Sequence, residues 1–474
     1  MDDCSITQKI ERVSPIAGAV DLLFTCSLVA AAAIPLDGLL MEEIVYDGSG
    51  RISLEEATRL TGHRLMPAVR ALSEAGLISI EGPTVLVREE VQYAVRAYVA
   101  SQLSPLRALA FADAKLTKAV DLANRWFPRS FQSESELNFA GRMLPHGLAV
   151  IDNAKRRIVD ENSEWWASEA EETKRLFLDI TADLADRMAT FLSRRGRPID
   201  IVALRQSSLA LNETLLGPDD RNIIYVLTDL AVAYRRNADL TLARATIEKA
   251  IQVAEARSLA DREACILYEH LGAICADSGS HNEAVVAYVK AVSLAEQGIP
   301  NDLRLAGRLH RGLGKAYLKL GRYLDASQSL EQAVQAGVQS LKSGDAALGV
   351  RYALWARALR GSGDALGALG AYAKAFSIGL RASGSSHVDV RKRLTALVEL
   401  ARLLNDQDAV RKVYSELVQN EIREFGETSI QVGSRYQELA EILHDMGDGA
   451  GSRPAFQTVA EPPIDGSGLS GDRE

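Results

Sequence analysis

The C-terminal two-thirds of the chain repeats with a period of about 42 residues, and this period constrains the fold more than any other feature. A position that we call the register mark holds a small residue in six of its seven copies, at Ala189, Ala231, Gly272, Gly314, Ala356, Val398 and Ala440. Consecutive marks lie 42, 41, 42, 42, 42 and 42 residues apart. A spacing this regular predicts a solenoid, in which each repeat packs only against its neighbours.

The unit at residues 313–333 shows how its positions are used. A Leu–small pair, Leu313 and Gly314, is followed by an aromatic residue, a turn glycine and small residues along a second helix. This pattern fits the tetratricopeptide repeat, and the resemblance implies pairs of antiparallel helices. Small residues let two helices cross closely, and we expect tyrosines to fill the wedge between neighbouring pairs: Tyr234, Tyr288, Tyr317 and Tyr372.

Glycines recur at the expected turn between the two helices of a unit, where a positive φ is often needed. They are Gly196, Gly279, Gly321, Gly363 and Gly447, with Asn237 and Asn405 at near-equivalent positions. The seventh unit has only its first helix, which suits a C-terminal cap. We therefore assign residues 176–447 to a solenoid of about 6.5 repeats. Residues 448–474 are rich in Gly, Ser and Pro, and we expect a disordered tail.

The period exceeds the roughly 34 residues of the minimal tetratricopeptide repeat. The extra residues include the loop Leu216-Gly-Pro-Asp-Asp220. This loop resembles the kinesin-light-chain-like class of repeat, whose loops carry an LGPxHP-like stretch. The loops at residues 385–389 and 425–428 look like degenerate versions of it.

The N-terminal part has a different pattern. After an N-terminus expected to be flexible (residues 1–13), residues 14–101 predict a helix pair followed by a winged-helix domain. A capping box at Ser53 starts one helix, and a second is expected from Arg64 to Ala75. Two alternating segments around Glu81-Gly82-Pro83 then predict a β-hairpin. Helix, turn, helix and hairpin together make the winged-helix arrangement.

Winged helices often bind DNA, and a recognition helix then needs several basic or amide side chains that face outward. In the candidate recognition helix the available cations are Arg64 and Arg70. Residues 51–96 contain six Arg and six Glu, and the whole chain carries a net charge of −9. This balance disfavours binding to nucleic acid or to anionic membranes. A structural or regulatory winged helix is favoured, and a DNA-binding transcription regulator with a ligand-sensing repeat domain is the alternative.

The order of the segments carries a further resemblance. A helix pair, a winged helix and a helical linker (residues 102–175) with Arg142-Met-Leu-Pro-His146 precede the long-period repeats. This resembles the C-terminal half of the NB-ARC/STAND class of signalling ATPases. The sequence has no GxxxxGK[ST] motif, and the Gly and Lys residues at 312–315 lie within a repeat helix. The resemblance therefore implies a sensor arm without its nucleotide-binding domain. The chain is then either a truncated relative or a partner of a separately encoded P-loop ATPase.

Basic residues gather on the first helices of the repeats, which line the concave groove of such arrays. From residue 307 to residue 360 there are nine Lys/Arg and three Asp/Glu. A basic groove can hold an acidic peptide or a C-terminal carboxylate through charge-assisted hydrogen bonds, and the alternative is a solvated helix face. The candidate groove residues are Arg235, Arg236, Arg308, Arg311, Lys315, Lys319, Arg357, Arg360 and Arg402.

No combination of residues in the sequence indicates catalysis, a metal site or a cofactor. The four cysteines, Cys4, Cys26, Cys265 and Cys275, have no CxxC spacing and fit small buried residues in a reducing cytoplasm. The apolar run Ile16–Leu36 contains Asp21 and Pro35, so we expect a buried core helix and no membrane span. The sequence thus predicts an all-α, cytoplasmic, non-enzymatic protein that binds another protein.

Overall fold

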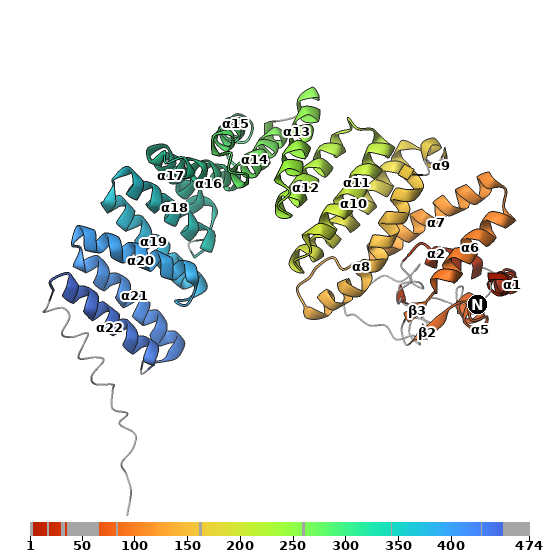
Figure 1. Cartoon of the computed structure of the whole chain (residues 1–474), viewed down its shortest axis with the longest axis horizontal. Coiled ribbons are helices and arrows are strands. Elements are labelled where there is room, and N and C mark those ends of the chain that lie inside the picture. Colours follow the sequence, from red (N-terminus) through yellow and green to blue (C-terminus); the bar gives the residue numbers. More distant parts are fainter. Residues whose placement is uncertain are drawn as a thin grey trace, which may run out of the picture. The chain divides into compact units, whose positions relative to one another are not determined.

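A computed structural model describes residues 3–16, 19–29, 34–35, 66–81, 84–160, 164–257, 261–342, 344–427 and 429–448. Nearly all of these residues are helical (Figure 1). They form two compact units: an N-terminal unit, Met1–Arg257, and a C-terminal unit, Ser258–Glu474. The boundary between them falls inside the solenoid predicted for residues 176–447, and no feature of the repeat period predicted it.

The first part of the N-terminal unit packs four helices together: α1 (Asp3–Val13), α2 (Ala19–Cys26), α5 (Met66–Glu74) and α6 (Glu89–Gln102). Residues 1–13 were expected to be flexible, but most of them form α1. The apolar side chains Ile6, Ile10 and Val13 recur at helical spacing and are buried, so α1 is held by the core.

A small antiparallel sheet in the order β1-β3-β2 completes this part: β1 (Ile34–Pro35), β2 (Ser79–Glu81) and β3 (Thr84–Leu86). Strands β2 and β3 form the expected hairpin, with Ile80 opposite Val85. The helix predicted to start at Ser53 lies outside the described residues.

The sequence predicted one buried core helix over the apolar run Ile16–Leu36, and this prediction was wrong. Among the described residues of this run the helical part is α2, and Ile34–Pro35 pairs with β3. Pro35 has no N–H for a helical hydrogen bond, and a residue that precedes proline avoids the α conformation. Among the helices that the structure describes, none combines the length and the apolar character of a membrane span.

The predicted helical linker forms four elements: α7 (Pro105–Trp126), α8 (Glu134–Lys155), a π-helical turn η1 (Arg156–Asp160) and α9 (Glu164–Ser168). Pro105 stands at the start of α7, where a missing N–H costs nothing. Phe127 and Phe131 pack against Phe191 of the first repeat helix with ring centroids 6.1 and 5.8 Å apart. These contacts join the linker to the repeats that follow.

Two helix pairs of the repeat complete the N-terminal unit: α10 (Glu171–Arg194), α11 (Pro198–Leu216), α12 (Arg221–Arg236) and α13 (Leu240–Ala256). The marks Ala189 and Ala231 lie on α10 and α12, which are the first helices of their pairs.

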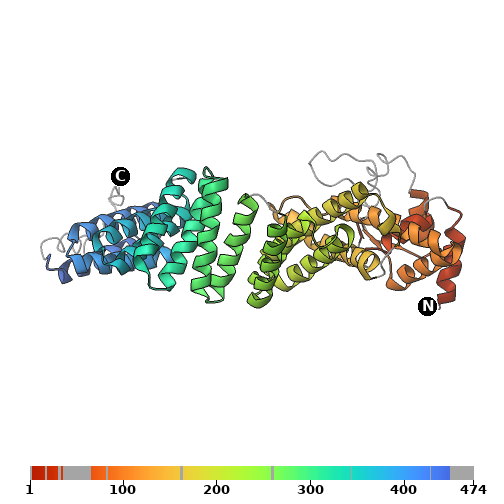
Figure 2. The same ribbon diagram turned by 90° about the horizontal axis from the view of Figure 1, so that it is seen from above.

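The C-terminal unit continues the array. Its first helices are α14 (Asp261–Asp277), α16 (Leu303–Lys319), α18 (Ala346–Ser362), α20 (Val388–Leu404) and α22 (Ile430–Asp445). Its second helices are α15 (His281–Gly298), α17 (Tyr323–Ser340), α19 (Ala365–Ser383) and α21 (Gln407–Phe425). Consecutive helices lie side by side, coloured green to blue in Figure 2. All seven register marks fall on first helices, which confirms the predicted all-α solenoid.

Glycine is required where these helices approach most closely. A Cβ added to Gly314 would lie 2.4 Å from Cγ of Leu330 on the second helix of the same pair. A Cβ added to Gly312 would lie 2.5 Å from the ring of Tyr288 in the preceding pair. The tyrosine thus fills the space between pairs, as the repeat pattern predicts.

The predicted turn glycines all have positive φ, from +68° at Gly196 to +92° at Gly363. Asn405 also does, with φ of +52°, but in the equivalent turn after α12 the residue with positive φ is Ala238 and not Asn237. Asn237 instead ends α12 with an ordinary φ of −82°. Further positive-φ glycines lie in the loops between repeats, at Gly217, Gly384 and Gly426.

Candidate partner-binding site

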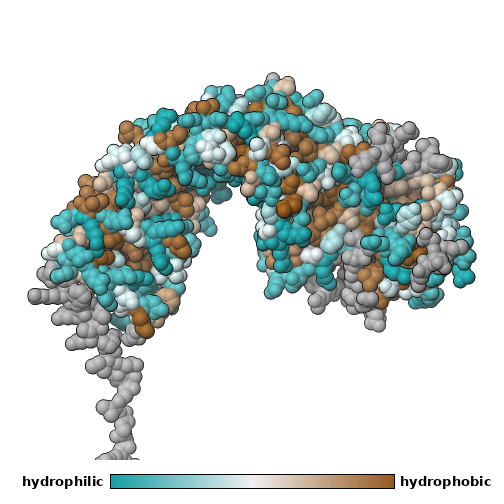
Figure 3. All heavy atoms as spheres, viewed as in Figure 1, coloured by the Kyte–Doolittle hydropathy of each residue, from teal (hydrophilic) through white to brown (hydrophobic). Residues whose placement is uncertain are grey.

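Two neighbouring first helices of the C-terminal unit, α16 and α18, contain eight Lys and Arg residues and no Asp or Glu. Seven of them are exposed or half-buried and form what we call the basic face: Arg304, Arg308, Arg311, Lys315, Lys319, Arg357 and Arg360. The five on α16 follow a helical stripe, while Leu305, Leu309 and Leu313 are buried on the opposite side. In Figure 3 hydrophilic residues predominate on the visible surface of the repeat helices, with hydrophobic residues between them.

Three of the predicted groove arginines join neighbouring first helices through ion pairs. Arg308 makes a two-pronged contact with Glu269 of α14, with Nε–Oε1 and Nη2–Oε2 distances of 3.0 and 2.9 Å. The hydrogen bond to Glu269 raises the pKa of Arg308. Nη1 of Arg360 lies 3.4 Å from Oε2 of Glu399 on α20. Nη2 of Arg402 lies 3.2 Å from Oδ2 of Asp445 on α22. These cations are therefore partly neutralised within the array.

The other cations of the basic face form no hydrogen bond or ion pair with any described residue through their side chains. Arg311, Lys315 and Lys319 on α16 and Arg357 on α18 belong to this group. Arg311 is half-buried, and its Nε has no hydrogen-bond partner among the described residues. Burial and the neighbouring Arg311 lower the pKa of Arg351 beneath the face. The uncompensated positive charge is thus centred on α16.

The remaining predicted site residues are dispersed. Arg235 and Arg236 lie at the end of α12, in the N-terminal unit, and Nη1 of Arg236 is 3.4 Å from Oγ of Ser193. Of the two candidate DNA-binding residues, Arg64 lies outside the described residues. Arg70 is exposed on α5, which also contains the exposed Glu74.

A cleft that the sequence analysis missed opens between α20, α21 and α22. It has a volume of about 590 Å³, and its charged lining includes Arg391, Arg402, Arg435, Glu399 and Glu438. These residues come from two neighbouring first helices, so their proximity depends on how the helices pack. Arg435 follows Arg393 by one repeat of 42 residues, and this offset is the sequence signal that could have identified it.

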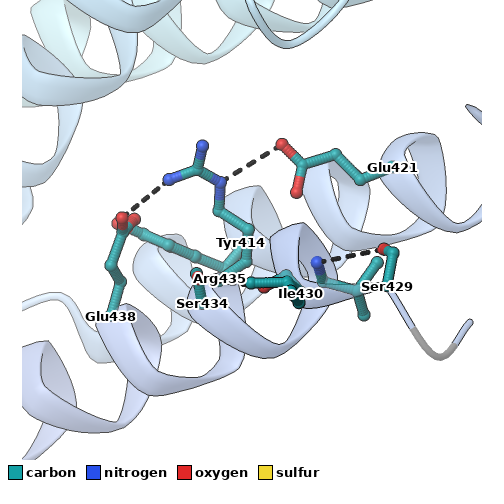
Figure 4. A network of polar contacts seen from close by, with 8 residues as sticks. Tyr414, Glu421, Ser429, Ile430, Ser434, Arg435 and Glu438 are labelled. Carbon is teal, nitrogen blue, oxygen red and sulfur yellow. Dashed lines mark hydrogen bonds and ion pairs between the residues drawn. The ribbon is translucent and has the colours of Figure 1, made fainter. Parts of the chain in front are cut away.

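A polar network at one wall of this cleft neutralises Arg435 (Figure 4). Its guanidinium contacts Oε1 of Glu421 on α21 at 3.2 Å and Oε1 of Glu438 on its own helix at 2.7 Å. The Tyr414 hydroxyl donates to Oε2 of Glu438 at 3.4 Å, and burial together with Glu438 raises the pKa of this tyrosine. Arg391, which is exposed and makes no side-chain contact of this kind with described residues, is then the free cation of the cleft.

Buried arginines also recur with the repeat period. Nη1 of Arg351 donates to the Ala333 carbonyl at 2.9 Å, and 42 residues later Arg393 donates to the Ala375 carbonyl at the same distance. Each guanidinium fits between two glycines, and we call this arrangement the arginine–glycine lock. A Cβ added to these glycines would lie 2.3 to 3.1 Å from the Nη1 atom: Gly307 and Gly337 against Arg351, Gly349 and Gly379 against Arg393.

The fold is an all-α solenoid of tetratricopeptide repeats, a class that generally mediates protein–protein interaction. The family model described as "Tetratricopeptide repeat" matches residues 180–256 and 262–336. No curated protein sequence matches the chain significantly. Among the described residues, no group of three or more His, Cys, Asp or Glu side chains could hold a metal ion.

Several solved structures are similar to this chain. BtubC (BKLC) from P. vanneervenii is 19% identical, with a TM-score of 0.40 over 50% of this chain and 91% of its own. A putative kinesin light chain from Podosopora anserina is 20% identical, with a TM-score of 0.36 over 42% and 96%. A signal transduction ATPase with numerous domains (STAND) from Pyrococcus horikoshii, which has a tetratricopeptide repeat sensor, is 14% identical. Its TM-score is 0.42 over 93% of this chain and 62% of its own.

Proposed function

We propose that this chain is a non-enzymatic interaction protein whose basic face binds an acidic segment of a partner protein. The observation that carries the proposal is the absence of any carboxylate from α16 and α18, which together hold eight cations. In a protein with a net charge of −9, such a face is the place where an acidic partner meets attraction and not repulsion.

The individual contacts support the same proposal. Lys315, Lys319 and Arg357 are exposed and have no carboxylate partner among the described residues, so an incoming carboxylate displaces only water. Arg308 is already held by Glu269, and we expect it to contribute a fixed donor and little net charge. Charge-assisted hydrogen bonds from several such groups give specificity and a high association rate, and both weaken as salt rises.

Fluorescence anisotropy with a labelled synthetic peptide of alternating Glu and Leu residues tests the proposal. Reversing three charges, in Lys315→Glu, Lys319→Glu and Arg357→Glu together, should weaken binding at least tenfold. The matched control reverses three exposed cations of the second helices, Lys290, Lys412 and Arg423, and leaves the same net charge. Equal losses in the two triple variants would show that net charge alone governs binding, and the proposal would then be wrong.

DNA binding is the alternative function. The hairpin of β2 and β3 directly follows α5, and Arg70 of that helix is exposed. We expect any such binding to appear as salt-dependent retardation of a DNA duplex that is reduced in Arg70→Glu. A duplex that is not retarded at low salt rejects this alternative.

A further inference from the structure

A small pocket in the N-terminal unit has arginines on one side and apolar walls on the other. It lies between α2, α6, α7, α8 and η1 and has a volume of about 220 Å³. Phe24 and Leu116 are among its apolar walls. Three guanidinium groups line it, those of Arg96, Arg156 and Arg157. Three like charges in a small pocket repel one another unless negative groups compensate them.

Arg157 has its counter-charge within the protein. Its Nε lies 2.7 Å from Oδ1 of Asp113, whose side chain is fully buried. A buried pair with this geometry holds both groups in place, and removing either one would leave a costly unpaired charge. We therefore assign Arg157 a structural role.

Arg96 has no carboxylate partner among the described residues. Its Nη2 donates to the Ser27 carbonyl at 2.6 Å, but its Nε is buried and has no hydrogen-bond partner in the described structure. Burial and repulsion from Arg156 lower the pKa of this guanidinium. An arginine stays protonated in proteins, so this repulsion persists and lowers the stability of the folded chain.

Arg156 is only weakly compensated. Its Nη2 donates to Oδ1 of Asn153 at 2.5 Å and lies 3.9 Å from Oδ2 of Asp152, whose side chain is largely exposed. An exposed pair at this distance contributes little. Arg156 also opens η1, and single π-helical turns inside α-helical segments occur frequently at functional sites.

We propose that this pocket binds the phosphate group of a small phosphorylated molecule, with Arg96 and Arg156 as its cationic ligands. Two poorly compensated guanidinium groups match the charge of roughly −1.5 to −2 that a phosphate monoester carries at pH 7. Guanidinium forks also fit phosphate oxygens in geometry. The apolar walls face the remainder of the ligand. This site lies outside the basic face and is independent of the function proposed above.

The volume of the pocket restricts the ligand. The pocket measures about 220 Å³. This is below the roughly 300–1,000 Å³ of pockets that take drug-sized molecules. The part of the ligand that enters the pocket is then a phosphate group with a short apolar or ring-sized substituent, and phenyl phosphate is a suitable probe.

Isothermal titration calorimetry of the full chain with phenyl phosphate, inorganic phosphate and benzoate, at constant ionic strength, tests this assignment. We expect saturable binding of phenyl phosphate, weaker binding of inorganic phosphate, and benzoate binding at least tenfold weaker than that of phenyl phosphate. Arg156→Gln should weaken phenyl phosphate binding at least tenfold. Because Arg156 is exposed, we expect this variant to keep the circular dichroism spectrum of the wild type.

Two further variants complete the test. Arg96→Gln should abolish binding as well, although it also removes the hydrogen bond to Ser27, so Arg156→Gln is the decisive variant. Arg107→Gln changes an exposed arginine of α7 that does not line the pocket, and it should bind as the wild type does. Absence of binding, undiminished binding in Arg156→Gln, or benzoate binding as tight as phenyl phosphate would overturn the proposal.

Discussion

Arg351 and Arg393 are buried cations that sit between pairs of glycines in consecutive repeats. Each guanidinium donates to a backbone carbonyl of the preceding second helix, which ties one repeat to the next. Glycine within a helix costs about 1 kcal/mol relative to alanine. The recurrence of glycine at Gly337 and Gly379 is explained by the space that the guanidinium needs.

In the third copy of this arrangement a carboxylate takes the place of the glycine that lies on the second helix, which is Gly337 or Gly379 in the earlier copies. Glu421 stands 42 residues after Gly379 and contacts Arg435 at 3.2 Å. Glu421 is only 1% exposed, and this contact compensates the burial of its carboxylate. The last described helix, α22, is thus attached by an ion pair where the earlier repeats use the lock.

The lock predicts opposite effects for two glycines of one helix. In Gly379→Ala the new methyl group would displace the Arg393 guanidinium from the Ala375 carbonyl, and we expect a destabilisation of about 1–3 kcal/mol. In Gly370→Ala, also on α19, the methyl group meets no atom within 4 Å, and we expect a gain of about 0.5–1 kcal/mol. Urea unfolding of both variants measures the two changes. A shift of the same sign in both would show that the guanidinium gives way easily.

The helix α8 begins with a capping box. Ser133 Oγ accepts from the Glu136 N–H at 3.2 Å, and the Glu136 carboxylate accepts from the Ser133 N–H at 3.0 Å. The carboxylate also accepts from the Ser130 hydroxyl and the Gln132 N–H, both at 2.7 Å. The hydrogen bond from Ser130, followed by those from the Ser133 and Gln132 N–H groups, lowers the pKa of Glu136 from 4.5 to about 2.

This cap predicts a pH dependence of known sign. Because the pKa of Glu136 is lower in the folded chain, its contribution is complete above pH 4.5 and is lost as the pH falls toward 2. Glu136→Gln cannot ionise, so the variant should lose less stability than the wild type between pH 6 and pH 3.5. Urea unfolding at both pH values gives the comparison. Equal losses in the two proteins would mean that the carboxylate is not held as described.

At the scale of the molecule, the array consists of two compact units, and each contains complete helix pairs. In a solenoid each repeat contacts only its neighbours, so stability is close to a sum of local terms. A unit of five first helices and four second helices then has enough internal interfaces to fold by itself.

We therefore expect a fragment of residues 258–474 to fold without the N-terminal unit. Its helical circular dichroism should equal the share of these residues in the full chain, and its urea midpoint should match one transition of the full chain. A fragment that is unfolded, or that unfolds at a midpoint found in no transition of the full chain, would show that the two units stabilise each other.

The sequence by itself determined the repeat period, the helix pairs and most of the turn conformations. These features depend on local requirements: a small residue at each helix crossing, such as Gly314, and a residue able to adopt a positive φ at each turn, such as Gly363. It also identified α16 as basic, because that charge lies within one helix.

Only the tertiary structure decided which charges are neutralised and which are not. Arg308 meets Glu269 across 39 residues, and Arg96 meets Arg156 across 60 residues, because helix packing brings their side chains together. The sequence counted all nine groove residues as equivalent cations, since a periodic pattern says which face a residue occupies but not what opposes it. The paired arginines, the α20–α22 cleft and the arginine pocket follow from the rotation and spacing of neighbouring helices.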